Sequence, residues 1–298
     1  MKIIYTNISP INNAYTNLNH IFYLKKHNPQ KVYVCVWDSF VYEHPLFEKS
    51  LDNTTNKEQK LKENVLILEK LMSSLKIDYK IIYLSEATNR LFRNSQYLLQ
   101  FHGILSNIKV EELKMGFGLE YVPFGKISLS KLNYIIADCL IATYLPELFP
   151  EICSSAPNYY LTSERFKAFE NNINTYLKTN FSKHIPPKRI FVKGVPVIMH
   201  PEKELIPSLE MSIDSISHIV KSHYTKKPDA REFSDLIEML SSILGEFELK
   251  DKKIKKVKLE RMYNRLNYEA FIEVISKNLY NYFIKIIEIT SKIDIQKR

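Results

Sequence analysis

The chain has 298 residues, of which 45% are hydrophobic and 12% aromatic, and its formal net charge is +9. This composition supports a sizeable core, and the length predicts one large domain with a smaller one. The 6 glycines form neither a Gly-x-Gly-x-x-Gly nor a P-loop pattern, which excludes phosphate cradles of those two kinds. The basic excess fits a polyanionic partner, although solubility alone also accounts for surface charge.

The 3 cysteines, Cys35, Cys139 and Cys153, are isolated from one another in the sequence. They form no disulfide framework and no zinc spacing, so we expect a reducing interior and no metal site. Met1 and Lys2 lead into a short strand rather than a signal peptide, and no apolar run approaches the length of a membrane-spanning helix. We therefore expect a cytoplasmic protein that does not enter a membrane.

The first 37 residues predict a strand, a polar loop, a helix and a second strand. Residues 1–7 are apolar and β-branched, Ser9 and Pro10 end them, and Asn17 is a good N-cap for a helix that continues to Leu24. Residues 31–37 form the second strand, so this is a βαβ unit of a parallel sheet. Ligands bind where such strands end, and the polar residues expected there are Ser9, Asn12, Asn17, Asn19, His20 and Asp38. The alternative is that these residues only form turns.

The middle of the chain predicts further elements of the same sheet. We expect a loop over 40–60, an amphipathic helix over 57–75, a strand over 80–84 and a helix over 90–106. A further helix begins near 110–114, and residues 115–125 are a glycine-bearing connection. Residues 128–144 form a long apolar helix that contains Asp138, and a charge there is either solvated at the helix edge or paired and functional.

The last third predicts a change of architecture. Short strands are expected over 157–161 and 190–199, with a helix over 163–179 between them and an irregular loop over 204–215. From Ile216 onward the apolar period is helical throughout, around 231–245, 256–264 and 267–290. The sequence thus predicts an α/β fold with a Rossmann-like parallel sheet and flanking helices over 1–215. A small all-α C-terminal domain follows over 216–298.

A dense basic run lies inside this helical part. It reads as either a solvated face or a contact with a phosphate backbone, and its basic residues are Lys252, Lys253, Lys255, Lys256, Lys258 and Arg261.

Three segments resemble the tyrosyl/tryptophanyl branch of the class I aminoacyl-tRNA synthetases. Asn17-Leu18-Asn19-His20 stands where that family has its His-Ile-Gly-His-like tetrad. Tyr134-Ile-Ile-Ala-Asp138, followed by Ser163-Glu164-Arg165, is similar to the family's amino-acid-binding helix and the segment after it. Glu210-Met211-Ser212-Ile213-Asp214 stands at its Lys-Met-Ser-Lys-Ser loop.

The resemblance implies a HUP-type fold, a ligase activity in protein biosynthesis and a C-terminal anticodon-binding domain. It implies ATP with Mg²⁺ as nucleotide, an amino acid and tRNA as partners, and a homodimer. His20 and Asn17 would meet the phosphates, Met211 and Ser212 would be the remnant loop, and the substrate would contact Asp38, Tyr134, Asp138 and Glu164.

The departures from the family pattern have physical consequences. Asn19 puts a side chain where adenine would lie on a glycine backbone, and Glu210 and Asp214 stand where lysines would neutralise the pyrophosphate. Two carboxylates beside a triphosphate repel it. These departures argue against ordinary ATP-dependent adenylation unless other groups replace the missing ones.

A second resemblance concerns the first loop. Ser9-Pro10-x-Asn12, followed by Tyr15-Thr16, is similar to the opening of the tRNA-dependent cyclodipeptide synthases, in which a serine attacks the ester of an aminoacyl-tRNA. It implies an ATP-independent aminoacyl transfer through Ser9, whereas the alternative is a serine that only ends a strand. A third hypothesis is a catalytically inactive, synthetase-like protein that binds tRNA.

Overall fold

The computed structural model describes residues 2–8, 18–39, 56–107, 129–163, 167–181, 185–192, 198–199, 204–205 and 212–295. The loop expected over 40–60 lies outside these residues except for 56–60, where helix α4 (Lys57–Ser74) begins. The helix start at 110–114 and the segment 115–125 lie outside them. So do four of the predicted site residues, namely Ser9, Asn17, Glu164 and Met211.

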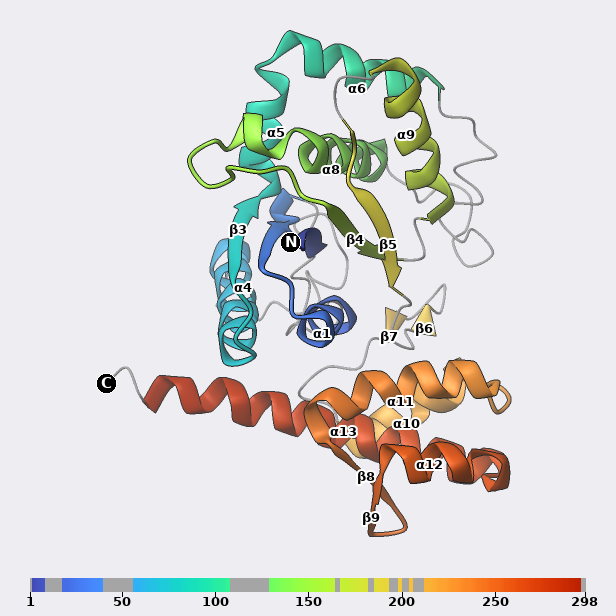
Figure 1. Ribbon diagram of the computed structural model, residues 1–298. Coiled ribbons are helices and arrows are strands. Elements are labelled where there is room, and N and C mark those ends of the chain that lie inside the picture. Colours follow the sequence, from blue (N-terminus) through green and yellow to red (C-terminus); the bar gives the residue numbers. More distant parts are fainter. Residues whose placement is uncertain are drawn as a thin grey trace.

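A parallel five-stranded sheet forms the centre of the molecule, as predicted (Figure 1). Its strands are β1 (Ile3–Ile8), β2 (Lys31–Val36), β3 (Tyr79–Tyr83), β4 (Tyr159–Ser163) and β5 (Lys188–Val192). They lie in the order β3-β2-β1-β4-β5, and every neighbouring pair is parallel. The chain order reverses between β1 and β4, which is the position where open α/β sheets bind their ligands. The Rossmann-like prediction is therefore confirmed.

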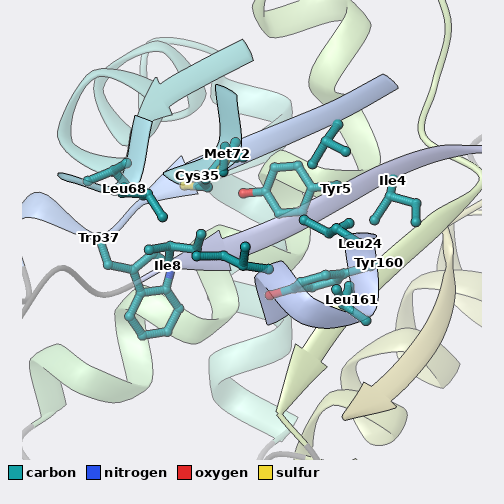
Figure 2. Packing of buried hydrophobic residues seen from close by; sticks show 14 of the residues in the cluster. Ile4, Tyr5, Ile8, Leu24, Cys35, Trp37, Leu68, Met72, Tyr160 and Leu161 are labelled. Atoms are coloured by element: carbon teal, nitrogen blue, oxygen red, sulfur yellow. The ribbon is translucent and has the colours of Figure 1, made fainter. Parts of the chain in front are cut away.

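Helices cover both faces of the sheet (Figure 1). On one face lie α1 (Leu18–His27) and α4 (Lys57–Ser74), and on the other lie α8 (Leu129–Leu148) and α9 (Lys167–Asn180). Alternate side chains of a strand point to opposite faces. In β1, Thr6 therefore contacts His20 of α1 while Tyr5 and Asn7 contact Asp138 of α8. Ile4, Ile8, Leu24, Leu68 and Met72 are among the apolar side chains of the core (Figure 2).

Several element boundaries differ from the sequence prediction, and the largest change in the first half of the chain follows β3. Strand β3 ends at Tyr83, and the expected helix over 90–106 is two helices, α5 (Leu84–Phe92) and α6 (Ser95–Asn107). The carboxylate of Asp38 accepts hydrogen bonds from the backbone N–H of Ser85, at 3.0 Å, and from its hydroxyl, so a residue at the end of β2 caps α5. Asn94 accepts from the N–H of Gln96 at 2.9 Å and starts α6.

Helix α8 extends past the predicted end. It continues to Leu148 with Pro146 inside it, and the backbone departs from helical values at Tyr144, with φ −105° and ψ 17°. A proline removes a helical hydrogen bond and clashes with the preceding turn, which accounts for a kink here. A small antiparallel pair, β6 (Ile198–Met199) and β7 (Glu204–Leu205), follows β5, and β7 falls where we expected only loop.

The C-terminal part is helical, as predicted, with one addition. Its helices are α10 (Ile213–His223), α11 (Ala230–Leu244), α12 (Lys256–Met262) and α13 (Tyr268–Ile295), with a short 3₁₀ turn over Tyr263–Arg265. Between α11 and α12 an antiparallel hairpin interrupts the helical period, formed by β8 (Glu246–Leu249) and β9 (Lys252–Lys255). Its two turn residues, Lys250 and Asp251, have φ of 48° and 61°. Neither is a glycine, so the turn was hard to predict from local sequence.

The two parts pack against each other. Helix α13 contacts α4, and α11 contacts α1 (Figure 1). Buried residues from Ile3 to Ile286 form one continuous apolar cluster. Within the described residues, none of the helices is both long and apolar enough to span a membrane.

Candidate functional site at the switch point of the sheet

Asp138 is the centre of a buried polar network between β1, β4 and α8. Its side chain is 0% exposed, and it accepts hydrogen bonds from the hydroxyls of Tyr5 and Tyr160. The side-chain amide of Asn7 donates to Asp138 Oδ2 at 2.9 Å and to the Tyr160 hydroxyl at 2.8 Å. The charge that stood out in the apolar run is therefore paired inside the protein rather than solvated.

Burial sets the protonation behaviour of this network. It raises the pKa of Asp138 above the usual range, and the hydrogen bonds from Tyr160, Tyr5 and Asn7 oppose that rise. It also raises the pKa of Tyr5 and of Tyr160, with the nearby Asp138 adding to the shift. Both phenols therefore stay protonated and donate to the carboxyl group.

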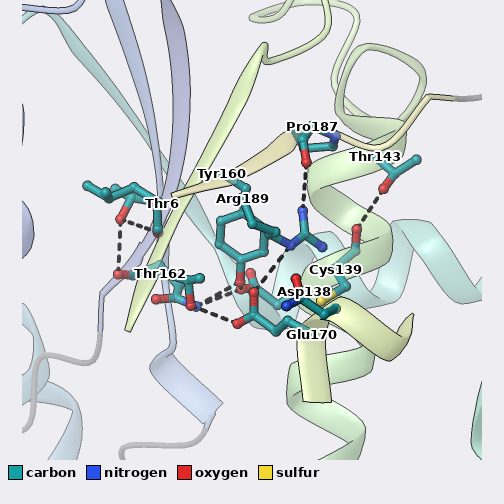
Figure 3. A network of polar contacts seen from close by, with 12 residues as sticks. Thr6, Asp138, Cys139, Thr143, Tyr160, Thr162, Glu170, Pro187 and Arg189 are labelled. Carbon is teal, nitrogen blue, oxygen red and sulfur yellow. Dashed lines mark hydrogen bonds and ion pairs between the residues drawn. The ribbon is translucent and has the colours of Figure 1, made fainter. Parts of the chain in front are cut away.

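A buried ion pair, formed by Arg189 and Glu170, adjoins the Asp138 network (Figure 3). The Nε of Arg189 on β5 lies 3.2 Å from Oε2 of Glu170 on α9, with side chains 3% and 1% exposed. Thr162 donates to Glu170 Oε1 at 2.7 Å, and Arg189 donates to the carbonyl of Pro187 at 3.2 Å. Burial raises the pKa of Glu170 to about 7 against the opposing effect of Arg189. The guanidinium lies 4.2 Å from the centroid of the Tyr160 ring, which joins the two groups into one network.

His20 lies on the opposite face of the sheet, near the end of β1. Its Nδ1 is 3.1 Å from the carbonyl oxygen of Asn7 and 3.2 Å from Oγ1 of Thr6, whose hydroxyl donates to the carbonyl of Leu161. The carbonyl oxygen of Asn7 and Oγ1 of Thr6 both act as acceptors here, so the proton of the neutral imidazole lies on Nδ1. Burial lowers the pKa of His20 to about 4, opposed by the bond to Asn7. The imidazole is therefore neutral at pH 7 and brings no positive charge to a phosphate.

The structure also describes Asp38, Ser212, Asp214 and Tyr134, which the sequence singled out. Asp38 caps α5 through both of its carboxylate oxygens. Ser212 is exposed and caps α10, accepting from the N–H of Ser215 at 3.3 Å. Asp214 lies in the first turn of that helix, where its charge is favourable to the helix dipole. Tyr134 is half-buried on α8. Catalytic or substrate-binding roles for these residues stay predictions.

Sequence reasoning missed most members of the buried network. Tyr5 and Asn7 lie in the first predicted strand and Tyr160 in a predicted short strand. Glu170 lies in a predicted helix, and Arg189 lies just before the strand expected over 190–199. None of the five was predicted as a site residue. The alternation of Tyr5 and Asn7 with Ile4 and Ile8 in β1 was an available signal, because it places two polar groups on one face of a buried strand.

The basic run divides between β9 and α12. Lys252, Lys253 and Lys255 are exposed on the hairpin, and Lys258 and Arg261 are exposed on α12, while Lys256 is half-buried. Lys256 lies 3.8 Å from Glu260. Two of the hairpin's three acids pair with α13, since Lys277 lies 2.5 Å from Asp251 and 3.4 Å from Glu248. The third, Glu246, is exposed and lies opposite Lys255, and the exposed lysines outnumber it. The exposed surface of the hairpin is therefore basic.

This chain is similar to known proteins in its structure rather than in its sequence. The sequence matches no protein-family model and no curated protein. Tyrosyl-tRNA synthetase from Archaeoglobus fulgidus, complexed with L-tyrosine, has a TM-score of 0.61 at 10% identity and is matched over 97% of this chain and 90% of its own. Tyrosyl-tRNA synthetase from Pyrococcus horikoshii, also complexed with L-tyrosine, has a TM-score of 0.58 at 11% identity. It is matched over 98% of this chain and 91% of its own.

A tryptophan-bound tryptophanyl-tRNA synthetase from Encephalitozoon cuniculi is also similar, with a TM-score of 0.53 at 14% identity over 98% of this chain and 80% of its own. Because the matches extend over nearly the whole chain, the helical C-terminal part belongs to the shared fold as well as the sheet. This chain therefore has the class I fold of the tyrosyl- and tryptophanyl-tRNA synthetases.

Proposed function

We propose that this protein is a synthetase-like tRNA-binding protein, which holds the RNA through the basic surface of its C-terminal part. The observation that carries the proposal is the group of exposed basic side chains on β9 and α12, in a chain that shares its fold with tRNA synthetases over nearly its full length. We further expect a homodimer in the cytoplasm, on the synthetase resemblance alone.

The charge distribution supports phosphate contact rather than internal pairing. On the hairpin, Glu248 and Asp251 are engaged by Lys277 of the neighbouring helix. Lys252, Lys253 and Lys255 are exposed, as are Lys258 and Arg261 on α12. Glu246 is also exposed, opposite Lys255, and the basic side chains outnumber it. Each lysine that neutralises a phosphate releases counterions, so binding should weaken steeply with salt.

Action on an amino acid is the second candidate. The solved synthetases of the same fold hold L-tyrosine or tryptophan. In this chain Asp138, the residue assigned to the amino acid by resemblance, accepts from Tyr5, Tyr160 and Asn7 instead. His20 is buried and neutral. These residues do not fit a role in holding the phosphates of ATP, and we propose no step through ATP.

Charge reversal on the hairpin tests the first candidate. We expect K252E/K253E/K255E to lower the affinity for total tRNA at least tenfold at 0.15 M salt. The slope of log K against log salt should fall by roughly two to three, because about three phosphate contacts are lost. The matched control is K80E/K178E/K188E, which reverses three exposed lysines of the α/β part. Equal losses in both variants, or no binding by the natural chain, would refute the proposal.

Amino-acid-dependent exchange of pyrophosphate into ATP tests the second candidate independently. We expect no exchange above background with tyrosine or tryptophan, because a neutral buried imidazole cannot stabilise the phosphates. Exchange that disappears in His20→Ala would establish adenylation. Formation of a dipeptide product from charged tRNA, abolished in Ser9→Ala, would instead establish aminoacyl transfer.

A further inference from the structure

Hydrogen-bonding and aromatic side chains enclose the phenol of Tyr160, as they would enclose a bound phenol. Its hydroxyl donates to Asp138 of α8 and accepts from the Asn7 amide of β1 at 2.8 Å. The Arg189 guanidinium of β5 lies 4.2 Å from the ring centroid, and the Tyr5 ring meets it edge to face at 5.2 Å and 84°. Four side chains from α8, β1 and β5 thus hold a ring that is 0% exposed, and Figure 3 shows Asp138 and Arg189 beside it.

The chemistry of these neighbours is specific for a phenol. A phenol hydroxyl offers one donor and accepts further bonds, which matches a carboxylate acceptor and an amide donor. The guanidinium and the edge of a second ring both complement the face of an aromatic ring. A purely apolar ring in the same place would leave Asp138 and Asn7 short of a partner in the interior, which is costly.

We infer that Tyr160 is a built-in occupant of a phenol-binding site at the β1–β4 switch point, and that it closes this site to an aromatic amino acid. The inference deepens the proposed function, because it gives the reason why a chain with this fold would bind tRNA without holding tyrosine there. Its test needs no RNA, so failure of one proposal is distinguishable from failure of the other.

Removal of the occupant should create a site for a free phenol. Deleting a large buried side chain leaves a cavity that small rings of matching shape enter. We expect Tyr160→Ala to bind p-cresol, measured by calorimetry and by the rise in melting temperature, about tenfold more tightly than toluene. One hydrogen bond to a buried carboxylate is of this magnitude. The natural chain should bind neither p-cresol nor L-tyrosine at this site.

Two variants make the result specific. In Y160A/D138A the preference for p-cresol over toluene should fall to near one, since position 138 then carries no oxygen that accepts from the phenol. Tyr33→Ala is the matched control, because Tyr33 is also buried on a central strand but donates to the backbone carbonyl of Ile152 at 3.2 Å. That variant should show a clearly weaker preference than Tyr160→Ala, because its acceptor is a neutral carbonyl and not a carboxylate.

Refolding gives the answer if Tyr160→Ala does not fold alone. The yield of folded Y160A after dilution from urea should then rise with p-cresol and not with toluene. Equal effects of the two compounds would overturn the inference. Binding of L-tyrosine to the natural chain, lost in Asp138→Asn, would also overturn it.

Discussion

Asp138 accepts hydrogen bonds from three side chains in a fully buried position. Asp138→Ala would leave two phenols and an amide without their acceptor, and we expect the free energy of unfolding to fall by about 3 kcal/mol or more. Asp138→Asn keeps one acceptor oxygen and should cost less. Urea denaturation at pH 7 measures both, with Asp78→Ala as an exposed control. A loss in Asp138→Ala no larger than in the control would contradict the network.

His20 should make the protein sensitive to acid. Its pKa is about 4 in the fold and 6.5 ordinarily, so between these values the unfolded chain binds the proton more tightly. The stability associated with the neutral imidazole is complete above pH 6.5 and is lost as the pH falls toward 4, by about 3 kcal/mol in total. His20→Asn should lack this loss. Urea denaturation from pH 7.5 to 4.5 compares the natural chain with that variant.

The natural chain has to be compared with His20→Asn because Glu170 changes the free energy of unfolding with pH in the opposite direction. Its pKa is about 7 in the fold and 4.5 ordinarily, so its contribution falls as the pH rises through that window. This term is common to both proteins and cancels in their difference. His102→Asn, at an exposed histidine of α6, is the control. If the difference between His20→Asn and the natural chain did not change with pH, the buried neutral imidazole would be refuted.

At the scale of elements, Lys227 binds the 3₁₀ turn that follows α12. Lys227 donates to the carbonyls of Tyr263 and Leu266 at 2.8 and 2.7 Å, and its ammonium lies 4.1 Å from the Tyr263 ring centroid. The Tyr263 carbonyl also accepts from the Leu266 N–H at 3.0 Å, so the lysine is a second donor to that carbonyl and a donor to the carbonyl of Leu266, which follows the 3₁₀ turn.

Lys227→Met keeps most of the apolar stem and removes the charged donor. We expect the free energy of unfolding to fall by about 1–2 kcal/mol, because the Leu266 carbonyl loses its lysine donor and the Tyr263 carbonyl keeps only the Leu266 N–H. Lys226→Met is the adjacent control, since Lys226 is exposed. Thermal and urea denaturation of the two variants should differ by this amount, and equal stabilities would show that the lysine does not hold the segment.

At the scale of the whole molecule, the packing of the two parts predicts cooperative unfolding. Trp37 is the only tryptophan and lies buried at the end of β2, so its fluorescence reports on the sheet. Far-UV circular dichroism reports on the helices of both parts. Because α13 packs on α4 and α11 on α1, we expect the two signals to change together in urea. A second transition seen only by circular dichroism would show that the predicted parts, 1–215 and 216–298, unfold separately.

Local sequence patterns predict the order and type of most elements. The βαβ opening, the amphipathic helix at 57–75, the apolar helix around Asp138 and the helical C-terminal part all follow from local periodicity, which depends on residues a few positions apart. The same information singled out Asp138, because a charge inside an apolar run is visible without the fold. The basic residues of 250–261 were visible for the same reason.

The contacts of Asp138 and Asp38 depend on the tertiary structure and not on local sequence. The partners Tyr5 and Asn7 lie 133 and 131 residues from Asp138 along the chain, and only the pairing of β1 with β4 brings them beside α8. The cap that Asp38 provides to α5 spans 47 residues, so it moved an element boundary that local propensity could not locate. Hydrogen bonds and ion pairs between distant segments depend on which faces the sheet and helices present to each other. That choice is fixed by packing of the whole core, which no local pattern encodes.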